Sequence, residues 1–242
     1  MLSFVTDHLL SLFYPQRCGA CGRLVEKVGF GVACRECWRS TALFDASDAL
    51  CPKCGLLLAA AAARSFSTCK DCDKHDYDIA RAAGVYEKAL AASVLHLKRT
   101  PNVPAAVRTG LINAFDRAEL PNELTLVPVP LSKQRLIERG FNQASLLARV
   151  IARHSGLPVD EYSLVRNHDT PMHRAAMDRK AREATVKNAF SVVRPNLIKG
   201  RNILLVDDVM TSGATASYCA KALKKGGAGR VYVLTLARAA KE

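Results

Sequence analysis

Apolar residues in the C-terminal two thirds of the chain follow two different patterns. Residues 203–206 form a continuous aliphatic run, as expected for a parallel strand buried on both faces. Residues 143–154 instead carry apolar side chains at 146, 147, 150 and 151, the spacing of an amphipathic helix. Further strands are predicted at the start of 82–98 and near 124–130, 161–166, 190–193 and 230–236, and further helices over the rest of 82–98, over 104–120 and up to about 225. This alternation predicts an α/β fold with a parallel sheet flanked by helices.

The first 80 residues lack this alternation. The polar stretch KDCDKHDYD predicts a boundary between an N-terminal module, residues 1–78, and an α/β domain, residues 79–242. Residues 2–14 predict a short amphipathic helix that packs on its own protein, with a membrane-surface helix as the less favoured alternative. Without a basic n-region, a small-residue cleavage site or eighteen consecutive apolar residues, we expect no signal peptide, no membrane span and a cytoplasmic protein.

The positive charge is concentrated in the predicted α/β domain. The chain has a net charge of +13, and residues 1–80 contain nine basic and nine acidic residues, so the excess lies in residues 81–242. A basic domain can bind a diphosphate-bearing substrate or a nucleic-acid backbone. The alternative is that the charge only keeps the protein soluble and serves no specific partner. Hydrophobic residues make up 49% of the chain and aromatic residues 6%, which predicts a mostly aliphatic core.

Eight of the nine cysteines form four C-x-x-C pairs, separated by twelve, thirteen and fourteen residues. Such pairs present two thiolates on one side of a tight turn, and four thiolates satisfy a tetrahedral Zn²⁺ ion. Because a cytosolic protein rarely keeps disulfides, the pattern predicts two structural zinc ions. The expected ligands are Cys18, Cys21, Cys34, Cys37, Cys51, Cys54, Cys69 and Cys72.

The spacing does not decide which two C-x-x-C pairs bind the same zinc ion. Two sequential sites, within residues 18–37 and within residues 51–72, are the simpler arrangement, but a cross-brace that joins the first pair to the third fits as well. A site closed by four cysteines has no open coordination position, so each zinc is expected to organise structure. The ninth cysteine, Cys219, is expected to be a buried packing residue without a catalytic role. His75 is expected to be a surface residue.

Two carboxylates and a group of small residues follow the strand predicted at 203–206. Asp207 and Asp208 are expected where this strand leaves the sheet, and a helix is expected to begin shortly after them. The amino end of a helix suits a phosphate, whereas carboxylates suit the hydroxyls of an attached sugar or a metal bound to it. An ordinary strand–turn–helix is the alternative, but the order of the parts favours a ribose 5-phosphate site. The expected phosphate-binding residues are Thr211, Ser212, Gly213, Ala214 and Thr215.

The segment D-D-V-M-T-S-G-A-T at 207–215 resembles the signature of type I phosphoribosyltransferases, which bind 5-phosphoribosyl 1-diphosphate (PRPP). The resemblance implies that Asp207 and Asp208 contact the ribose 2- and 3-hydroxyls and act as the catalytic pair. It also implies that residues 211–215 take the 5-phosphate and that Mg²⁺ accompanies PRPP. Phosphoribosyl transfer passes through an oxocarbenium-like sugar while negative charge develops on the leaving pyrophosphate. Positively charged groups would stabilise that negative charge.

Nearly the whole chain is similar to the ComF family, in which a double zinc ribbon precedes a phosphoribosyltransferase-type domain. The motifs are V-P-V-P-L-S-K-Q-R-L-I-E-R-G-F-N-Q at 127–143, the acid-pair segment and the final strand V-Y-V-L-T-L-A-R at 231–238. Residues 132–139 are predicted to be a basic loop at the carboxyl edge of the sheet. The resemblance implies that the pyrophosphate pocket includes Ser132, Arg139, Gly140 and Asn142.

The basic stretch 166–187 is either a solvated helix face or a lid that closes over a diphosphate. The ComF resemblance implies that residues 166–190 form the hood over the site. Relatives have a glutamine and an R-x-x-N motif there. In this chain His173 or Arg174 stands near the first, Arg182 keeps the arginine, and Thr185 replaces the asparagine.

Two hypotheses follow for function. The first is a PRPP-dependent phosphoribosyl transfer to an acceptor that no motif identifies, in a protein linked to DNA uptake and natural transformation. The alternative is a non-catalytic component of DNA uptake that binds single-stranded DNA and uses the PRPP fold as a ligand-binding scaffold. A PRPP-sensing regulator is a third hypothesis, although no helix-turn-helix pattern supports it.

Overall fold

The structure is a computed structural model of the 242-residue chain, and it describes residues 15–58, 69, 72–167 and 189–240. The amphipathic segment predicted at 2–14 lies outside these residues. Most of the predicted hood lies outside them as well, including His173, Arg174, Arg182 and Thr185.

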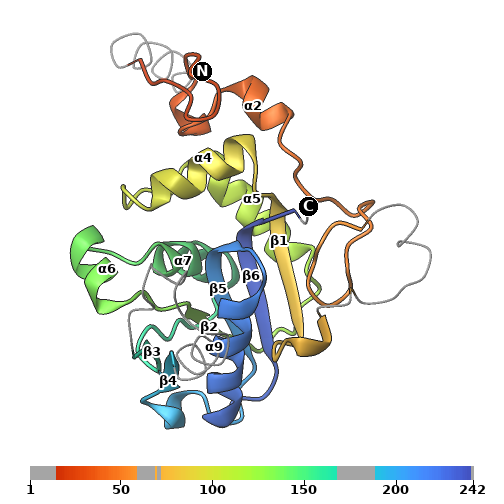
Figure 1. The fold of residues 1–242 in the computed structure, drawn as a ribbon, viewed down its shortest axis with the longest axis vertical. Coiled ribbons are helices and arrows are strands. Elements are labelled where there is room, and N and C mark those ends of the chain that lie inside the picture. Colours follow the sequence, from red (N-terminus) through yellow and green to blue (C-terminus); the bar gives the residue numbers. More distant parts are fainter. Residues whose placement is uncertain (1–14, 59–68, 70–71, 168–188, 241–242) are drawn as a thin grey trace, which may run out of the picture.

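The body of the protein is built on one parallel sheet with the strand order β1-β6-β5-β2 (Figure 1). The strands are β1 (Ile79–Val85), β2 (Thr125–Pro128), β5 (Ile203–Met210) and β6 (Val231–Arg238). Every residue of β6 is buried, because β6 pairs with a strand on both sides and is covered on both faces. The predicted α/β class and parallel sheet are therefore confirmed.

Helices cover both faces of the sheet. One face is covered by α4 (Lys88–Leu97), α5 (Ala105–Asp116) and α7 (Gln143–Ser155), and the other by α9 (Ala214–Lys225) (Figure 1). Side chains of β5 alternate accordingly: Leu204 and Val206 pack with α4, α5 and α7, whereas Ile203 and Leu205 pack with α9. The continuous apolar run therefore reflects burial on both sides.

Two of the predicted strands lie outside the parallel sheet, which corrects the expectation. β3 (Leu164–Arg166) and β4 (Phe190–Val192) form a separate antiparallel pair. Each buries only one of its three residues, because the pair covers the outer side of α9 instead of entering the sheet. Val192, for example, lies against Gly226 at the end of α9.

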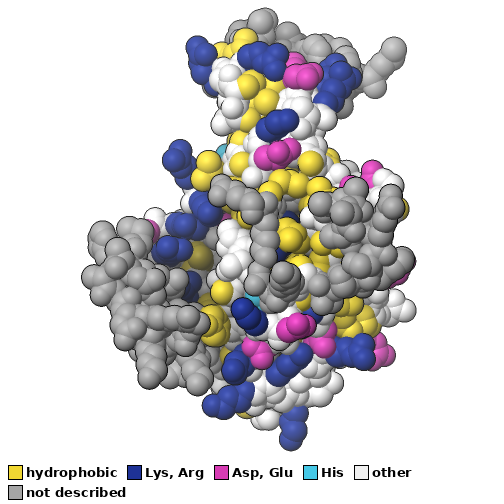
Figure 2. Space-filling view, turned by 45° about the vertical axis from the view of Figure 1, so that its right-hand side comes forward, with side chains coloured by type: hydrophobic (Ala, Val, Ile, Leu, Met, Phe, Trp, Pro, Cys, Tyr) yellow, Lys and Arg dark blue, Asp and Glu magenta, His cyan; other side chains and the backbone are white. Residues whose placement is uncertain are grey.

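The N-terminal module has little regular structure. It contains η1 (Val28–Phe30), α2 (Arg35–Arg39) and η2 (Cys72–Lys74). Its first part forms a lobe above α4, joined to the body through a narrower waist (Figures 1 and 2). The boundary at residue 78 stays a prediction. Within the described ranges, no helix combines the length and apolar character that crossing a membrane requires.

Candidate functional site

The acid pair lies inside a strand, which corrects the predicted end of the strand at Val206. β5 continues to Met210, and Asp207 is paired with Thr235 of the neighbouring β6. Because β6 runs alongside as far as Arg238, it supplies backbone partners beyond the apolar run. Successive side chains of a strand point to opposite faces, so the two carboxylates emerge on different sides of the sheet.

Asp208 lies on the face covered by α4 and α7, where it is only 6% exposed. The side-chain amide of Gln143 donates a hydrogen bond to its Oδ2 over 3.4 Å, and the Lys98 ammonium lies 3.8 Å from the same oxygen. Arg139 in turn donates to Oε1 of Gln143 over 2.9 Å. The segment predicted to bind pyrophosphate is thus connected to the acid pair. Lys98 and Gln143 were not predicted as site residues, although Gln143 closes the R-G-F-N-Q motif.

Asp207 lies on the face covered by α9 and is half-buried. Burial raises the pKa of its carboxyl well above the usual range, and the neighbouring charge of Asp208 raises it further. Its Oδ1 accepts a hydrogen bond from the backbone N–H of Asp208 over 2.8 Å. Cys219 is fully buried as predicted, and burial raises the pKa of its thiol, with a second contribution from the charge of Asp207. Because burial and Asp208 both disfavour the charged form of Asp207, a hydroxyl that donates to this carboxylate, or a cation beside it, would stabilise it.

The predicted basic loop at 132–139 is a helix, which corrects that expectation. α6 (Lys133–Arg139) begins at Ser132, whose hydroxyl accepts from the backbone N–H of Arg135, and ends at Gly140 with φ +75°. No residue of α6 is buried, and Ile137 is 83% exposed. The helix forms because both of its ends are capped, while its position depends on the flanking residues.

Asn142 holds the junction between α6 and α7. Its side-chain amide donates to the carbonyl of Val129 over 3.0 Å, and its Oδ1 accepts from the backbone N–H of Ala144 over 3.1 Å. Asn142 is therefore the N-cap of α7 and also ties that helix to the end of β2. Of the predicted pyrophosphate residues, Ser132, Gly140 and Asn142 shape the backbone, and Arg139 reaches toward the acid pair through Gln143.

The predicted phosphate-binding residues form the turn between β5 and α9. Thr211, Ser212 and Gly213 make the turn, and Gly213 is the N-cap of α9 with φ +81°. A Cβ atom at Gly213 would lie 3.0 Å from both Met210 Cε and Tyr77 Oη, so the turn requires glycine for space as well as for conformation. Thr211, Ser212, Ala214 and Thr215 are exposed. The turn therefore presents the amino end of a helix to solvent.

A cavity of about 610 Å³ opens beside this turn. Its lining includes Thr211 and Ser212 of the turn together with Cys54, Lys74 and His75. His75 is half-buried and stacks on Tyr77 with ring centroids 5.0 Å apart, so it is a surface residue that is partly covered. The polar sequence around the last cysteine pair did not indicate that His75 packs on Tyr77.

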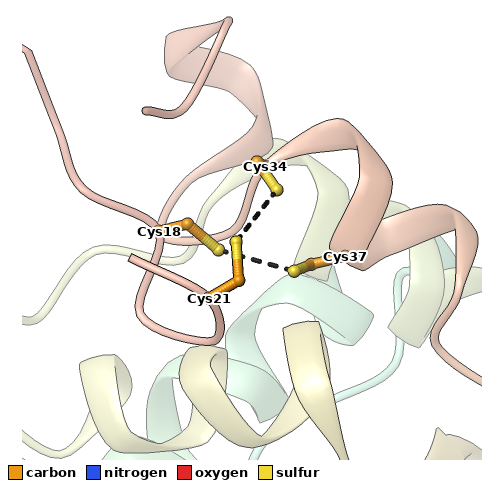
Figure 3. Close-up of side chains that lie close together, drawn as sticks. All are labelled: Cys18, Cys21, Cys34 and Cys37. Atoms are coloured by element: carbon orange, nitrogen blue, oxygen red, sulfur yellow. Dashed lines mark hydrogen bonds between the residues drawn. The ribbon is translucent and has the colours of Figure 1, made fainter. Parts of the chain in front are cut away.

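The first cysteine cluster contains Cys18, Cys21, Cys34 and Cys37, and their sulfur atoms converge on one point (Figure 3). The Cys18 and Cys37 sulfurs are 3.7 Å apart, as are those of Cys21 and Cys34. Four sulfurs at the zinc–thiolate distance from a tetrahedral ion lie about 3.8 Å apart, so the donor set fits zinc. This cluster belongs to a small core of its own with Val25, Ala33 and Ala89.

The second cluster contains Cys51, Cys54, Cys69 and Cys72. The Cys51–Cys72 and Cys54–Cys69 sulfur distances are both 3.5 Å. The two sequential sites are confirmed, and the cross-brace is excluded. This cluster also fits zinc, but Cys51, Cys54 and Cys72 share the main core with β5, β6 and α9. Arg238, which was not predicted, links Cys54 to the turn after β5.

Comparisons with known proteins agree with these features. The double zinc ribbon domain family matches residues 9–73. The "DNA utilization protein YhgH" of Escherichia coli K12 is 30% identical over 235 residues, which cover 94% of this chain and 99% of that protein. "Competence protein ComFC" of Bacillus subtilis is 35% identical over 134 residues, or 55% of this chain and 52% of that protein.

Solved structures that match the chain include the glutamine PRPP amidotransferase of Bacillus subtilis. It is 19% identical, with a TM-score of 0.41, and the match covers 59% of this chain and 30% of that one.

Proposed function

Because the chain belongs to the ComF family, we propose that the carboxyl end of its sheet binds PRPP or another ribose 5-phosphate. One observation carries the proposal. Asp208 is connected through Gln143 to Arg139, and the same strand leads directly into the turn at Gly213 and the amino end of α9. Acid pair, cation and phosphate cradle therefore meet at one edge of the sheet, where parallel α/β folds bind ligands.

Each part has a distinct task in this proposal. Asp207 and Asp208 accept hydrogen bonds from the ribose hydroxyls, and the amino end of α9 takes the 5-phosphate. Arg139 and Lys98 supply positive charge on the side where a diphosphate would lie. Mg²⁺ bound with PRPP would neutralise part of the diphosphate charge. In a transfer reaction the carboxylates stabilise positive charge on the sugar, while the cations stabilise the leaving pyrophosphate.

The names of two relatives support a biological setting for the proposed activity. Their names refer to DNA utilization and to competence, so we assign the chain to DNA uptake or natural transformation. No motif of the sequence and no contact among the described residues identifies the acceptor of a phosphoribosyl group.

A second candidate is direct binding of single-stranded DNA. It is favoured by the net charge of +13, all of it in residues 81–242, and by Lys133 and Arg135 on the exposed α6. Lys and Arg side chains are spread over the face seen in Figure 2. Phosphate contacts of this kind bind any sequence and weaken steeply with salt. Binding of an oligonucleotide that is absent, or insensitive to salt, would rule this candidate out.

A calorimetric titration with PRPP and Mg²⁺ tests the first proposal. Asp208→Asn removes a charge at the centre of the site, and we expect its Kd for PRPP to rise about tenfold or more. Asp116→Asn is the matched control, because Asp116 is exposed and pairs with His154 away from the site. Wild-type protein that contains two zinc ions but does not bind PRPP would overturn the proposal.

A further inference from the structure

Arg238 is the last residue of β6 and is only 5% exposed. Its Nη1 donates to the backbone carbonyl of Met210 over 2.9 Å and also to the carbonyl of Thr211. Its Nε donates to the carbonyl of Cys54 over 3.4 Å, and its Nη2 lies 3.9 Å from the Cys54 sulfur. One buried guanidinium thus spans from the second cysteine cluster to the start of the phosphate-binding turn.

A zinc ion held by the second cluster would give that cluster the negative charge needed to balance this buried arginine. A guanidinium stays protonated in proteins, and a buried charge is costly unless a group of opposite charge lies near it. Four thiolates around one Zn²⁺ carry a net charge of about −2. The planar fork of arginine then allows the same side chain to donate to carbonyls on its other side.

These contacts fix the direction of the turn. In a planar trans peptide the C=O and the following N–H point in opposite directions. Since Arg238 holds the carbonyls of Met210 and Thr211, the N–H groups of Thr211 and Ser212 point away from it. Arg238 therefore sets which way the donors at the start of the turn face.

The segment that follows the second cluster braces the same turn from another side. Tyr77 is buried, and its hydroxyl oxygen would lie 3.0 Å from a Cβ atom at Gly213. The backbone N–H of Asp76 donates to Ser217 Oγ over 2.9 Å, and that hydroxyl donates to Asp76 Oδ2 over 3.0 Å. The Lys53 ammonium donates to the carbonyl of His75 over 2.9 Å, which joins this segment to the second cluster.

We propose that Arg238 is a positioning residue that transmits the order of the second zinc centre to the phosphate-binding turn. The inference rests on the proposed function, because it gives the turn its role as a ribose 5-phosphate site. Arg238 also lines the cavity beside the turn, but its guanidinium is buried and already bonded to backbone carbonyls, so we assign it a positioning role and not that of a phosphate ligand. Loss of the second zinc is then expected to weaken ligand binding at the turn.

Arg238→Lys tests the proposal, with Arg230→Lys as the matched control. Lysine keeps the charge but lacks the planar fork, so it cannot reach Cys54 and both carbonyls together. We expect the Kd for ribose 5-phosphate to rise about tenfold. The Kd for inorganic pyrophosphate should change less than about twofold, because pyrophosphate is assigned to residues 132–142. Arg230 is exposed and precedes β6 at its other end, so its substitution should change neither Kd.

Hydrogen exchange without ligand gives an independent measurement. Amides of residues 211–217 should exchange faster in Arg238→Lys, while the protein still contains two zinc ions. The same amides should exchange faster in wild-type protein when a chelator removes the second zinc, followed through peptides that contain Cys54. Removal of only the first zinc, followed through peptides that contain Cys21, should leave them unchanged.

The possible outcomes separate the two proposals. Unchanged exchange and unchanged affinities in Arg238→Lys would overturn the positioning role. If the wild type binds no ribose 5-phosphate, the proposed function fails, but the exchange rates still decide whether the zinc centre and the turn are coupled. If Arg238→Lys does not fold, the chelator experiment on the wild type decides, and loss of the second zinc without faster exchange at 211–217 would overturn the coupling.

Discussion

The two cysteine clusters have the same four ligands but different surroundings. The first lies in a lobe with a small core that rests on Ala89 of α4, and Thr41 joins the lobe to the same helix by accepting from the N–H of Ala89. The second lies in the main core beside β5, β6 and α9, and Arg238 connects it to the proposed ligand site. The comparison teaches that a zinc ribbon can be a peripheral lobe or an internal part of an α/β domain, and that ligand spacing alone does not distinguish the two.

Substitution of one buried ligand in each cluster is expected to give the largest difference. Cys51→Ser should release one zinc and destabilise the whole sheet by more than about 4 kcal/mol, because the vacated site is in the main core. Cys34→Ser should release the other zinc and loosen residues 15–40, with the main unfolding transition lowered by less than about 1 kcal/mol. Zinc content and thermal unfolding followed by circular dichroism measure both effects. Equal losses in the two variants would contradict the comparison.

A pair of glycines is expected to give a smaller difference. Both have positive φ, +77° at Gly22 and +63° at Gly55. A Cβ atom at Gly22 would have no neighbour within 4 Å, whereas at Gly55 it would lie 2.7 Å from the carbonyl oxygen of Ala80 in β1. Gly22→Ala should cost about 1 kcal/mol through backbone conformation alone, and Gly55→Ala about 2–3 kcal/mol because β1 must also shift.

Denaturant unfolding monitored at equilibrium gives both glycine values. If Gly55→Ala costs no more than Gly22→Ala, the second ribbon is less tightly joined to the sheet than its contacts indicate.

One hydroxyl beside each cluster extends the comparison, and the substitution beside the second cluster is expected to have the smallest effect of all. Thr41 Oγ1 donates to the carbonyl of Cys37 over 2.6 Å and accepts from the N–H of Ala89 over 3.1 Å, so Thr41→Val should cost about 1–2 kcal/mol within the lobe. The Tyr77 hydroxyl is buried without a hydrogen-bond partner among the described residues. Tyr77→Phe should therefore change stability by less than about 0.5 kcal/mol. A large loss in Tyr77→Phe would show that this hydroxyl has a partner, and the thermal midpoint is the measurement.

Features that depend on local pattern were predicted from the sequence. The apolar run 203–206 indicated a strand buried on both faces, and the spacing at 146, 147, 150 and 151 indicated the buried side of α7. The four cysteine pairs predicted two zinc sites because each knuckle is a local turn. Asp207, Asp208 and the turn at Gly213 were found together for the same reason, since strand, turn and helix are consecutive in the sequence.

Features that depend on distant parts of the chain were missed. The end of β5 was placed too early, because its last residues are held by β6 and not by their own hydrophobicity. α6 was predicted as a loop because its seven residues bury nothing, although Ser132 and Gly140 are recognisable caps. Arg238 looks like an ordinary basic residue at a strand end. Its role depends on Cys54, which is 184 residues away.

The position of β6 in the sheet also sets the order in which the chain can fold. β6 is a central strand, yet it comes last of the four in the sequence. The backbone N–H of Val231 meets the carboxylate of Asp78 across a separation of 153 residues. At typical translation rates a ribosome needs roughly 8–30 s to make that length. During this time β1 cannot pair with β6, so its strand edge is exposed. Chaperones that bind an unpaired strand edge are therefore expected to assist folding during synthesis.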